Sequence, residues 1–261
     1  MIGPAGSSPP PAGASARVNE LAVAAIVLLA AFTQGAIGFG FGLVAMGILP
    51  LVVDELVAIP MVAVYSLLVA GMIAWRERHF LSWRRLAPPL VGVLLGVPVG
   101  LLFLAQADPK YIRLALGVFL VLYCLWSLLV SLRAGQRAVE DGWGYVAGLA
   151  SGVLGGAFNT GGPPLVVYAT LKNWDKDAAT STLQVLFAIT SVIAIGGHIA
   201  ADRMTEDVVR IILILLPVVG LGVWLGGRVY NRIDQATFRK GMLALLFVAG
   251  LVFINKSLHL V

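Results

Sequence analysis

Apolar residues run along this chain in long blocks that carry few charged side chains. A bilayer core requires about 20 apolar residues in a helix, and each block is close to that length. Each block therefore predicts a membrane-spanning helix. The blocks cover residues 56–75, 86–106, 110–132, 178–201, 208–227 and 237–254.

Two further apolar stretches, 18–53 and 143–171, are interrupted by residues that a helix interior tolerates poorly. Residues 155–164 of the second stretch include glycines, an asparagine and two prolines. Glycine weakens a helix, and each proline removes a hydrogen-bond donor and disfavours helix in the residue before it. We therefore predict two short helices that meet around Asn159. The first stretch contains a similar break within residues 33–42.

The composition supports an integral membrane protein. The chain is 59% hydrophobic and only 12% charged, which leaves too few polar side chains to cover the surface of a soluble domain. Residues 1–17, rich in Pro, Gly, Ser and Ala, are expected to form a flexible N-terminal tail. The net charge of +5 is spread over short loops, which argues against a nucleic-acid partner.

Several kinds of chemistry have no candidate residues. The single cysteine, Cys124, leaves no disulfide or metal scheme, and no carboxylate falls in the middle of a predicted span. The sequence also lacks the GxxxxGK[ST] loop that binds nucleotide phosphates. We therefore expect no metal, no cofactor and no enzymatic activity.

The chain contains an internal duplication. Residues 95–100 (LGVPVG) match residues 221–226 (LGVWLG), and at the same offset 108–113 match 234–239. Membrane transporters are often built from such repeats. We predict an all-α polytopic membrane protein with two homologous halves, residues 18–135 and 138–261. The expected fold has about eight membrane segments, with a broken or re-entrant helix opening each half.

The distribution of basic residues favours an inverted repeat. If each interrupted stretch is counted as one span, the 18 Lys and Arg divide almost equally between the two faces. If each is a hairpin or re-entrant pair, twelve share one face, which the positive-inside rule makes cytoplasmic, and both termini lie outside. These twelve are Arg76, Arg78, Arg84, Arg85, Arg133, Arg137, Lys172, Lys176, Arg228, Arg232, Arg239 and Lys240.

The two breaks are the candidate binding site. Non-helical backbone at membrane depth persists only where protein buries it or where it lines a polar cavity. A helix that begins near Pro163 would direct its free amides and partial positive charge toward the break, as in an anion site. The candidate substrate-binding residues are Gln34, Gly38, Gly40, Gly155, Gly156, Asn159, Thr160, Gly161, Gly162, Pro163 and Gln184. By contrast, Gly92, Gly96, Gly100, Gly222 and Gly226 have the small-xxx-small spacing of helix packing.

The sequence resembles the sulfite exporter TauE/SafE family of membrane transporters from about residue 20 to its C-terminus. The resemblance rests on the order and spacing of GFGFGLVAMGILPLV (38–52), RERHFLSWRRL (76–86), DPKYIRLALG (108–117), GGAFNTGGPPLVVY (155–168) and AATSTLQ (178–184). It implies a bacterial inner-membrane permease for small anions, typically sulfur-containing ones such as sulfite, thiosulfate or organosulfonates. The family's Gly-rich break carries over to residues 155–163, whereas the first break has no Gly-Gly-Pro.

The function expected from these features is anion transport by alternating access. The partners expected are a small anionic substrate and the lipid bilayer, with a homo-oligomer left open. Two alternatives remain at this stage: a non-transporting membrane subunit whose glycines pack against a partner, and a passive anion channel, which the lack of a coupling carboxylate would suit.

Overall fold

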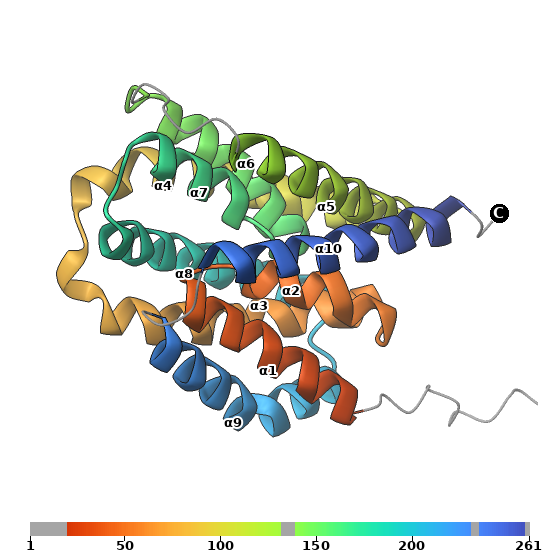
Figure 1. The fold of residues 1–261 in the computed structure, drawn as a ribbon. Helices are drawn as coiled ribbons and strands as arrows, with labels where there is room; N and C mark the ends of the chain where they lie inside the picture. Colours follow the sequence, from red (N-terminus) through yellow and green to blue (C-terminus); the bar gives the residue numbers. More distant parts are fainter. Residues whose placement is uncertain (1–19, 132–138, 231–234, 259–261) are drawn as a thin grey trace, which may run out of the picture.

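The protein is a bundle of α-helices (Figure 1). The computed structural model describes residues 20–131, 139–230 and 235–258, and these ranges contain no β-strand. The predicted tail, residues 1–17, lies outside them. The helices are α1 (Glu20–Ile37), α2 (Phe41–Ile48), α3 (Glu55–Arg76), α4 (Trp83–Gln106), α5 (Pro109–Ser131), α6 (Trp143–Phe158), α7 (Gly162–Leu171), α8 (Lys176–Ala200), α9 (Glu206–Val229) and α10 (Gln235–Leu258), with short 3-10 turns at Leu49–Leu51 and Arg78–Phe80.

The helices agree with the hydrophobic pattern. The six uninterrupted apolar blocks correspond to α3, α4, α5, α8, α9 and α10. Both interrupted stretches are broken where glycines gather, so that α1 and α2 form one pair and α6 and α7 form another. In the described ranges, six helices are long and apolar enough to cross a membrane: α1, α3, α4, α5, α8 and α9. Because α10 is not among them, the span predicted over residues 237–254 stays a prediction. The expected total of about eight membrane segments stays a prediction.

Glycine seams join the first helix of each half to the fourth helix of the other half. A Cβ atom added at Gly92, Gly96 or Gly100 of α4 would lie 2.2, 2.4 or 2.2 Å from a carbonyl oxygen of α6, at Tyr145, Leu149 and Val153 respectively. Because these contacts advance in the same order along both helices, α4 and α6 run parallel. The packing role predicted for these glycines is thereby confirmed.

The second seam joins α1 and α9 in the same way. A Cβ atom at Gly222 would lie 2.9 Å from the carbonyl oxygen of Leu28, and one at Gly226 would lie 2.2 Å from that of Phe32. These two helices therefore also run parallel, and the packing role predicted for their glycines is confirmed. The remaining large contacts pair α3 with α8 and α5 with α10.

Basic side chains gather at one end of the bundle, which we call the basic end. There, the Lys176 ammonium lies 3.4 Å from the ring centroid of Tyr230, and the Arg76 guanidinium lies 5.7 Å from it. Lys172 donates a 2.6 Å hydrogen bond to Asp141, which lowers the pKa of that carboxyl and ties the end of α7 to the start of α6.

The opposite end of the bundle carries the start of α3 and the end of α4. Glu55, at the start of α3, forms an ion pair with Arg113 of α5. Arg203 donates a 3.0 Å hydrogen bond to the carbonyl of Leu104, near the end of α4. These contacts and those of the basic end fix the direction of each long helix, and the two broken pairs meet between the ends.

Candidate functional site

The first break is made of two glycines with left-handed backbone. Gly38 and Gly40 have φ angles of 89° and 110°, a region that residues with a side chain rarely adopt. Between them lies Phe39, and α2 begins directly after Gly40. The glycines therefore allow the chain to leave α1 and start a new helix within three residues.

The second break uses an asparagine and two prolines. Asn159 ends α6 in the left-handed conformation, with φ 54° and ψ 24°, which asparagine tolerates better than most residues. The next helix, α7, begins at Gly162, with prolines in its first turn. Proline suits that position because the first amides of a helix have no partner within it.

The two breaks contact each other. A Cβ atom at Gly42, in the first turn of α2, would lie only 1.8 Å from the carbonyl oxygen of Asn159. Glycine is therefore required for the N-terminus of α2 to reach the second break. The N-termini of α2 and α7, which come from different halves of the chain, consequently border the same cavity.

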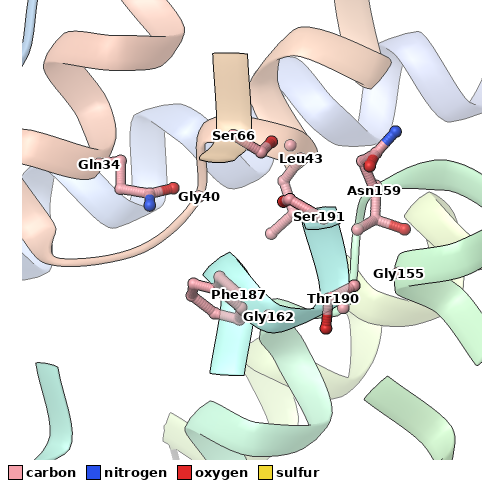
Figure 2. Close-up of a pocket in the computed structure, with 13 residues that line it drawn as sticks. Gln34, Gly40, Leu43, Ser66, Gly155, Asn159, Gly162, Phe187, Thr190 and Ser191 are labelled. Carbon is pink, nitrogen blue, oxygen red and sulfur yellow. The ribbon is translucent and has the colours of Figure 1, made fainter. Parts of the chain in front are cut away.

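Residues from α1, α2, α3, α8 and the α6–α7 pair enclose this cavity (Figure 2). Figure 2 shows the polar side chains of Gln34, Ser66, Asn159, Thr190 and Ser191 around one space. The full lining consists of Gln34, Gly40, Gly42, Leu43, Ser66, Gly155, Asn159, Thr160, Gly161, Gly162, Phe187, Thr190 and Ser191. None of these residues carries a charge.

Four backbone amides at the cavity have no hydrogen-bond partner in the described part of the chain. They belong to Gly42 and Leu43 in α2 and to Gly161 and Gly162 at the start of α7. The first amide of α2, that of Phe41, instead donates to the side-chain oxygen of Gln34 at 3.0 Å. Free amides at a helix N-terminus, together with the helix dipole, favour a bound anion.

Three hydroxyl groups face the same cavity. Ser66 of α3 and Thr190 and Ser191 of α8 are 9%, 6% and 2% exposed, and no hydrogen bond is formed by their hydroxyls in the described ranges. A buried hydroxyl normally has a partner, most often a carbonyl of its own helix. These three are therefore available to a ligand, and each can donate a hydrogen bond to it.

Two buried glutamines connect the first break to α8. The Gln34 amide nitrogen donates to the Gln184 side-chain oxygen at 2.8 Å, and the Gln184 nitrogen donates to the Gly38 carbonyl at 2.6 Å. Both side chains are buried, so each of these hydrogen bonds is shielded from water. The pair therefore holds the N-terminus of α2 in place across the two halves.

Replacing Gln184 with leucine is expected to lower the free energy of unfolding by about 1–3 kcal/mol, because Gln34 and the Gly38 carbonyl lose buried partners. The measurement is denaturant-induced unfolding in detergent micelles. Gln106→Leu is the matched control, because Gln106 is exposed at the end of α4. Equal stability of the two variants would contradict a structural role for the glutamine pair.

The cavity brings together seven of the residues predicted from the sequence. These are Gln34, Gly40, Gly155, Asn159, Thr160, Gly161 and Gly162. Four others lie outside its lining. Gly38 packs against Thr180, and Gly156 lies in the seam with α4. Pro163 borders an apolar groove next to α5. Gln184 accepts a hydrogen bond from Gln34 but does not itself line the cavity.

Sequence reasoning missed the hydroxyls of α3 and α8. One signal was present for α8: Gln184, Phe187 and Ser191 are spaced at i, i+3 and i+7, so they share a helix face. Thr190 and Ser191 form a polar pair inside this predicted span, near the face that carries the candidate residue Gln184. That pattern would have predicted them as site residues. Ser66 has no comparable signal, because its direction depends on how α3 packs.

Two broken membrane helices that meet at a neutral cavity rich in free donors are typical of a membrane transporter. The sequence profile of the sulfite exporter TauE/SafE family matches residues 23–253. The chain therefore belongs to this family, which confirms the resemblance seen in its motifs.

Two curated relatives are similar over much of the chain. The "Probable inner membrane transporter protein TsaS" of Comamonas testosteroni is 30% identical over 65% of this chain and 71% of its own length. The "Probable sulfite/organosulfonate exporter TauE" of Cupriavidus necator is 26% identical over 88% of this chain and 91% of its own length. No solved structure matches the chain.

Proposed function

We propose that this protein is a bacterial inner-membrane carrier for small sulfur-containing anions, such as sulfite, thiosulfate or an organosulfonate. The observation that carries the proposal is the set of four free amides and three free hydroxyls around one uncharged cavity. Such donors suit the oxygens of a sulfur oxyanion. The Cupriavidus necator relative is named a probable sulfite/organosulfonate exporter, which supports the same class of substrate.

The absence of Lys and Arg from the cavity lining suits a carrier. A buried cation would hold an anion through a strong ion pair, and breaking that pair at release would be costly. Dipoles and neutral donors bind an anion without a full countercharge. The site therefore combines binding with release, which a transport cycle requires.

The two halves, residues 18–135 and 138–261, form an inverted repeat in this proposal. The helix α4 begins at the basic end and α6 runs parallel to it, whereas α9 begins at the opposite end and α1 runs parallel to it. The equivalent helices α1 and α6 thus start from opposite ends. This arrangement supports alternating access, in which the halves rock around a shared central site.

The basic end faces the cytoplasm in this proposal. Arg76, Lys172 and Lys176 lie there, and the positive-inside rule favours the cytoplasmic side for such residues. The start of α1 and the end of α10 both lie toward the other end, apart from each other (Figure 1). Both termini are then periplasmic. Of the twelve basic residues predicted to share this face, Arg133, Arg137 and Arg232 lie outside the described residues.

A second cavity forms the route from the basic end to the site. It is lined by residues such as Lys176, Thr180 and Phe39, and we call it the vestibule. Phe39 and Phe187 separate it from the site, because both rings approach Gly162: a Cβ atom there would lie 3.6 Å from each. Phe39, between the two left-handed glycines, acts as a gate.

Replacing Phe39 with alanine is expected to open the site to the vestibule. Two variants are made in a Cys124→Ala background. The thiol of Ala179→Cys, in the vestibule, should react rapidly with an anionic methanethiosulfonate. The thiol of Ser191→Cys, in the site, should react slowly. Adding Phe39→Ala should raise the modification rate of the cysteine at position 191 at least about tenfold and leave the modification rate at position 179 unchanged. Removing a barrier of about 1.4 kcal/mol raises a rate tenfold. An unchanged rate at Ser191 would rule out a gate at Phe39.

Flux into proteoliposomes tests the function itself. Purified protein should take up radiolabelled sulfite or 2-hydroxyethanesulfonate with saturation, and unlabelled substrate inside the vesicles should accelerate uptake. That acceleration is the property of a carrier and not of a channel. Linear flux without acceleration would instead establish a passive channel, and no flux from folded protein would favour a non-transporting subunit.

A further inference from the structure

We propose that the cavity selects anions that carry a single negative charge together with a hydrogen-bond donor of their own. Hydrogen sulfite and hydroxyalkanesulfonates meet this description, whereas sulfate, the sulfite dianion and sulfoacetate do not. The inference rests on the proposed transport function and restricts its substrate class. Two independent features of the cavity carry it: its electrostatics and one unpaired acceptor.

The electrostatics of the cavity match one negative charge. No ionisable side chain from α1, α2, α3, α8 or the α6–α7 pair lines the cavity. Its positive potential comes from the N-termini of α2 and α7, each equivalent to about half an elementary charge. Together they balance about one negative charge. A dianion would keep an uncompensated charge in the protein interior, where desolvation penalises it strongly.

The unpaired acceptor is the side-chain oxygen of Asn159. Its amide nitrogen donates a 2.9 Å hydrogen bond to the carbonyl of Ile59. This bond fixes the orientation of the amide, because the flipped amide would set two oxygens against each other. The side-chain oxygen is buried and has no hydrogen-bond partner in the described part of the chain.

An unpaired acceptor beside an anion site is unfavourable unless the ligand supplies a donor. Oxygens of a fully deprotonated anion would be repelled by the Asn159 oxygen, since both carry only lone pairs. A ligand hydroxyl or ammonium group would satisfy it instead and remove the cost of a buried unpaired acceptor. The four amides and three hydroxyls then bind the anionic oxygens of the same ligand.

This restriction also accounts for the lack of a carboxylate in the cavity. Hydrogen sulfite brings its own proton, which crosses with the anion and dissociates on the other side. The protein then needs no titratable group at the site to couple sulfite movement to protons. A hydroxyalkanesulfonate keeps its hydroxyl proton throughout and moves as a single charge.

Competition among three sulfonates of similar size tests the inference. The probes are 2-hydroxyethanesulfonate, propane-1-sulfonate and sulfoacetate, each competing with labelled 2-hydroxyethanesulfonate in proteoliposomes. We expect 2-hydroxyethanesulfonate to bind about tenfold more tightly than propane-1-sulfonate, because its hydroxyl forms one additional buried hydrogen bond. Sulfoacetate, a dianion, should compete at least about a hundredfold more weakly than 2-hydroxyethanesulfonate, because its second charge stays uncompensated in the cavity.

Asn159→Gly is the matched variant, because glycine accepts the φ of 54° without strain. It should abolish the preference for 2-hydroxyethanesulfonate over propane-1-sulfonate and still exclude sulfoacetate. Size-exclusion chromatography checks that the variant is folded. Equal competition by the first two probes in the wild-type protein would overturn the role of Asn159, and strong competition by sulfoacetate would overturn the charge argument. Absence of uptake of every sulfonate would instead overturn the proposed function.

Discussion

Alanine in place of Gly42 is expected to abolish most of the transport activity. The added methyl group would lie 1.8 Å from the Asn159 carbonyl oxygen, so α2 has to move away from the second break. The neighbour is backbone and cannot rotate aside. Separating the two helix N-termini would remove half of the amides from the anion, and we expect flux to fall more than about tenfold, as overpacking costs of 1–3 kcal/mol allow.

Gly71→Ala is the control for this prediction. Gly71 lies inside α3, and nothing would lie within 4 Å of a Cβ atom added there. Alanine is also a better helix former than glycine, so the control should fold and transport normally. Flux is measured per folded protein, by initial rates in proteoliposomes. Wild-type flux in Gly42→Ala would contradict a site formed by the contact of the two breaks.

A carboxylate in the cavity is the second change with a large expected effect. Ser191→Asp adds a negative charge beside the helix N-termini, in the position that we assign to the substrate anion. At a separation of about 5 Å and an effective dielectric constant of about 20, two negative charges repel by about 3 kcal/mol. We therefore expect the affinity for a sulfonate to fall about a hundredfold.

Ser191→Asn separates charge from size. Asparagine has the shape of aspartate and no charge, so any loss shared by both variants is steric. The charge effect is the ratio between them, measured as the half-saturation concentration for uptake and as thermal stabilisation by the sulfonate. If the two variants bind the anion equally, the cavity around Ser191 is not the anion site.

The breaks in the two interrupted helices could be predicted because their causes are local. Gly38 and Gly40 adopt left-handed backbone and the prolines after Gly162 open a helix, and each is a property of the residue itself. Asn159 likewise ends α6 in a conformation that suits its residue type. Polar backbone of this kind persists at membrane depth only where protein buries it or where it lines a polar cavity, which is why the breaks were candidates for a site.

The direction of individual side chains could not be predicted in the same way. Gly156 lies within the second break by sequence, yet it faces the carbonyl of Val97 in the seam with α4. Pro163 lies in the first turn of α7 but faces the groove beside α5. Which face of a helix meets the cavity depends on its neighbours. For the same reason, Ser66 was not distinguishable from a serine that binds its own helix.

The contact between halves also depends on the tertiary structure. The glycine spacing of α4 and α9 predicted close helix packing, but spacing alone does not name the partner helix. The hydrogen bond between Gln34 and Gln184 joins residues 150 positions apart, and neither periodicity nor composition indicates it. Such pairs emerge only when helices of the two halves pack against each other, here α1 and α8.

The most direct test of the anion site is to locate a bound sulfonate. A crystal structure of the protein with 3-bromo-2-hydroxypropane-1-sulfonate, which carries one negative charge and a hydroxyl donor, would reveal the bromine by its anomalous scattering. The proposed function predicts a bromine peak inside the cavity bordered by Ser66, Gly162 and Ser191, with the sulfonate oxygens toward the amides of α2 and α7. Bromine peaks confined to the vestibule or to the groove beside α5, with the cavity filled by water alone, would contradict it.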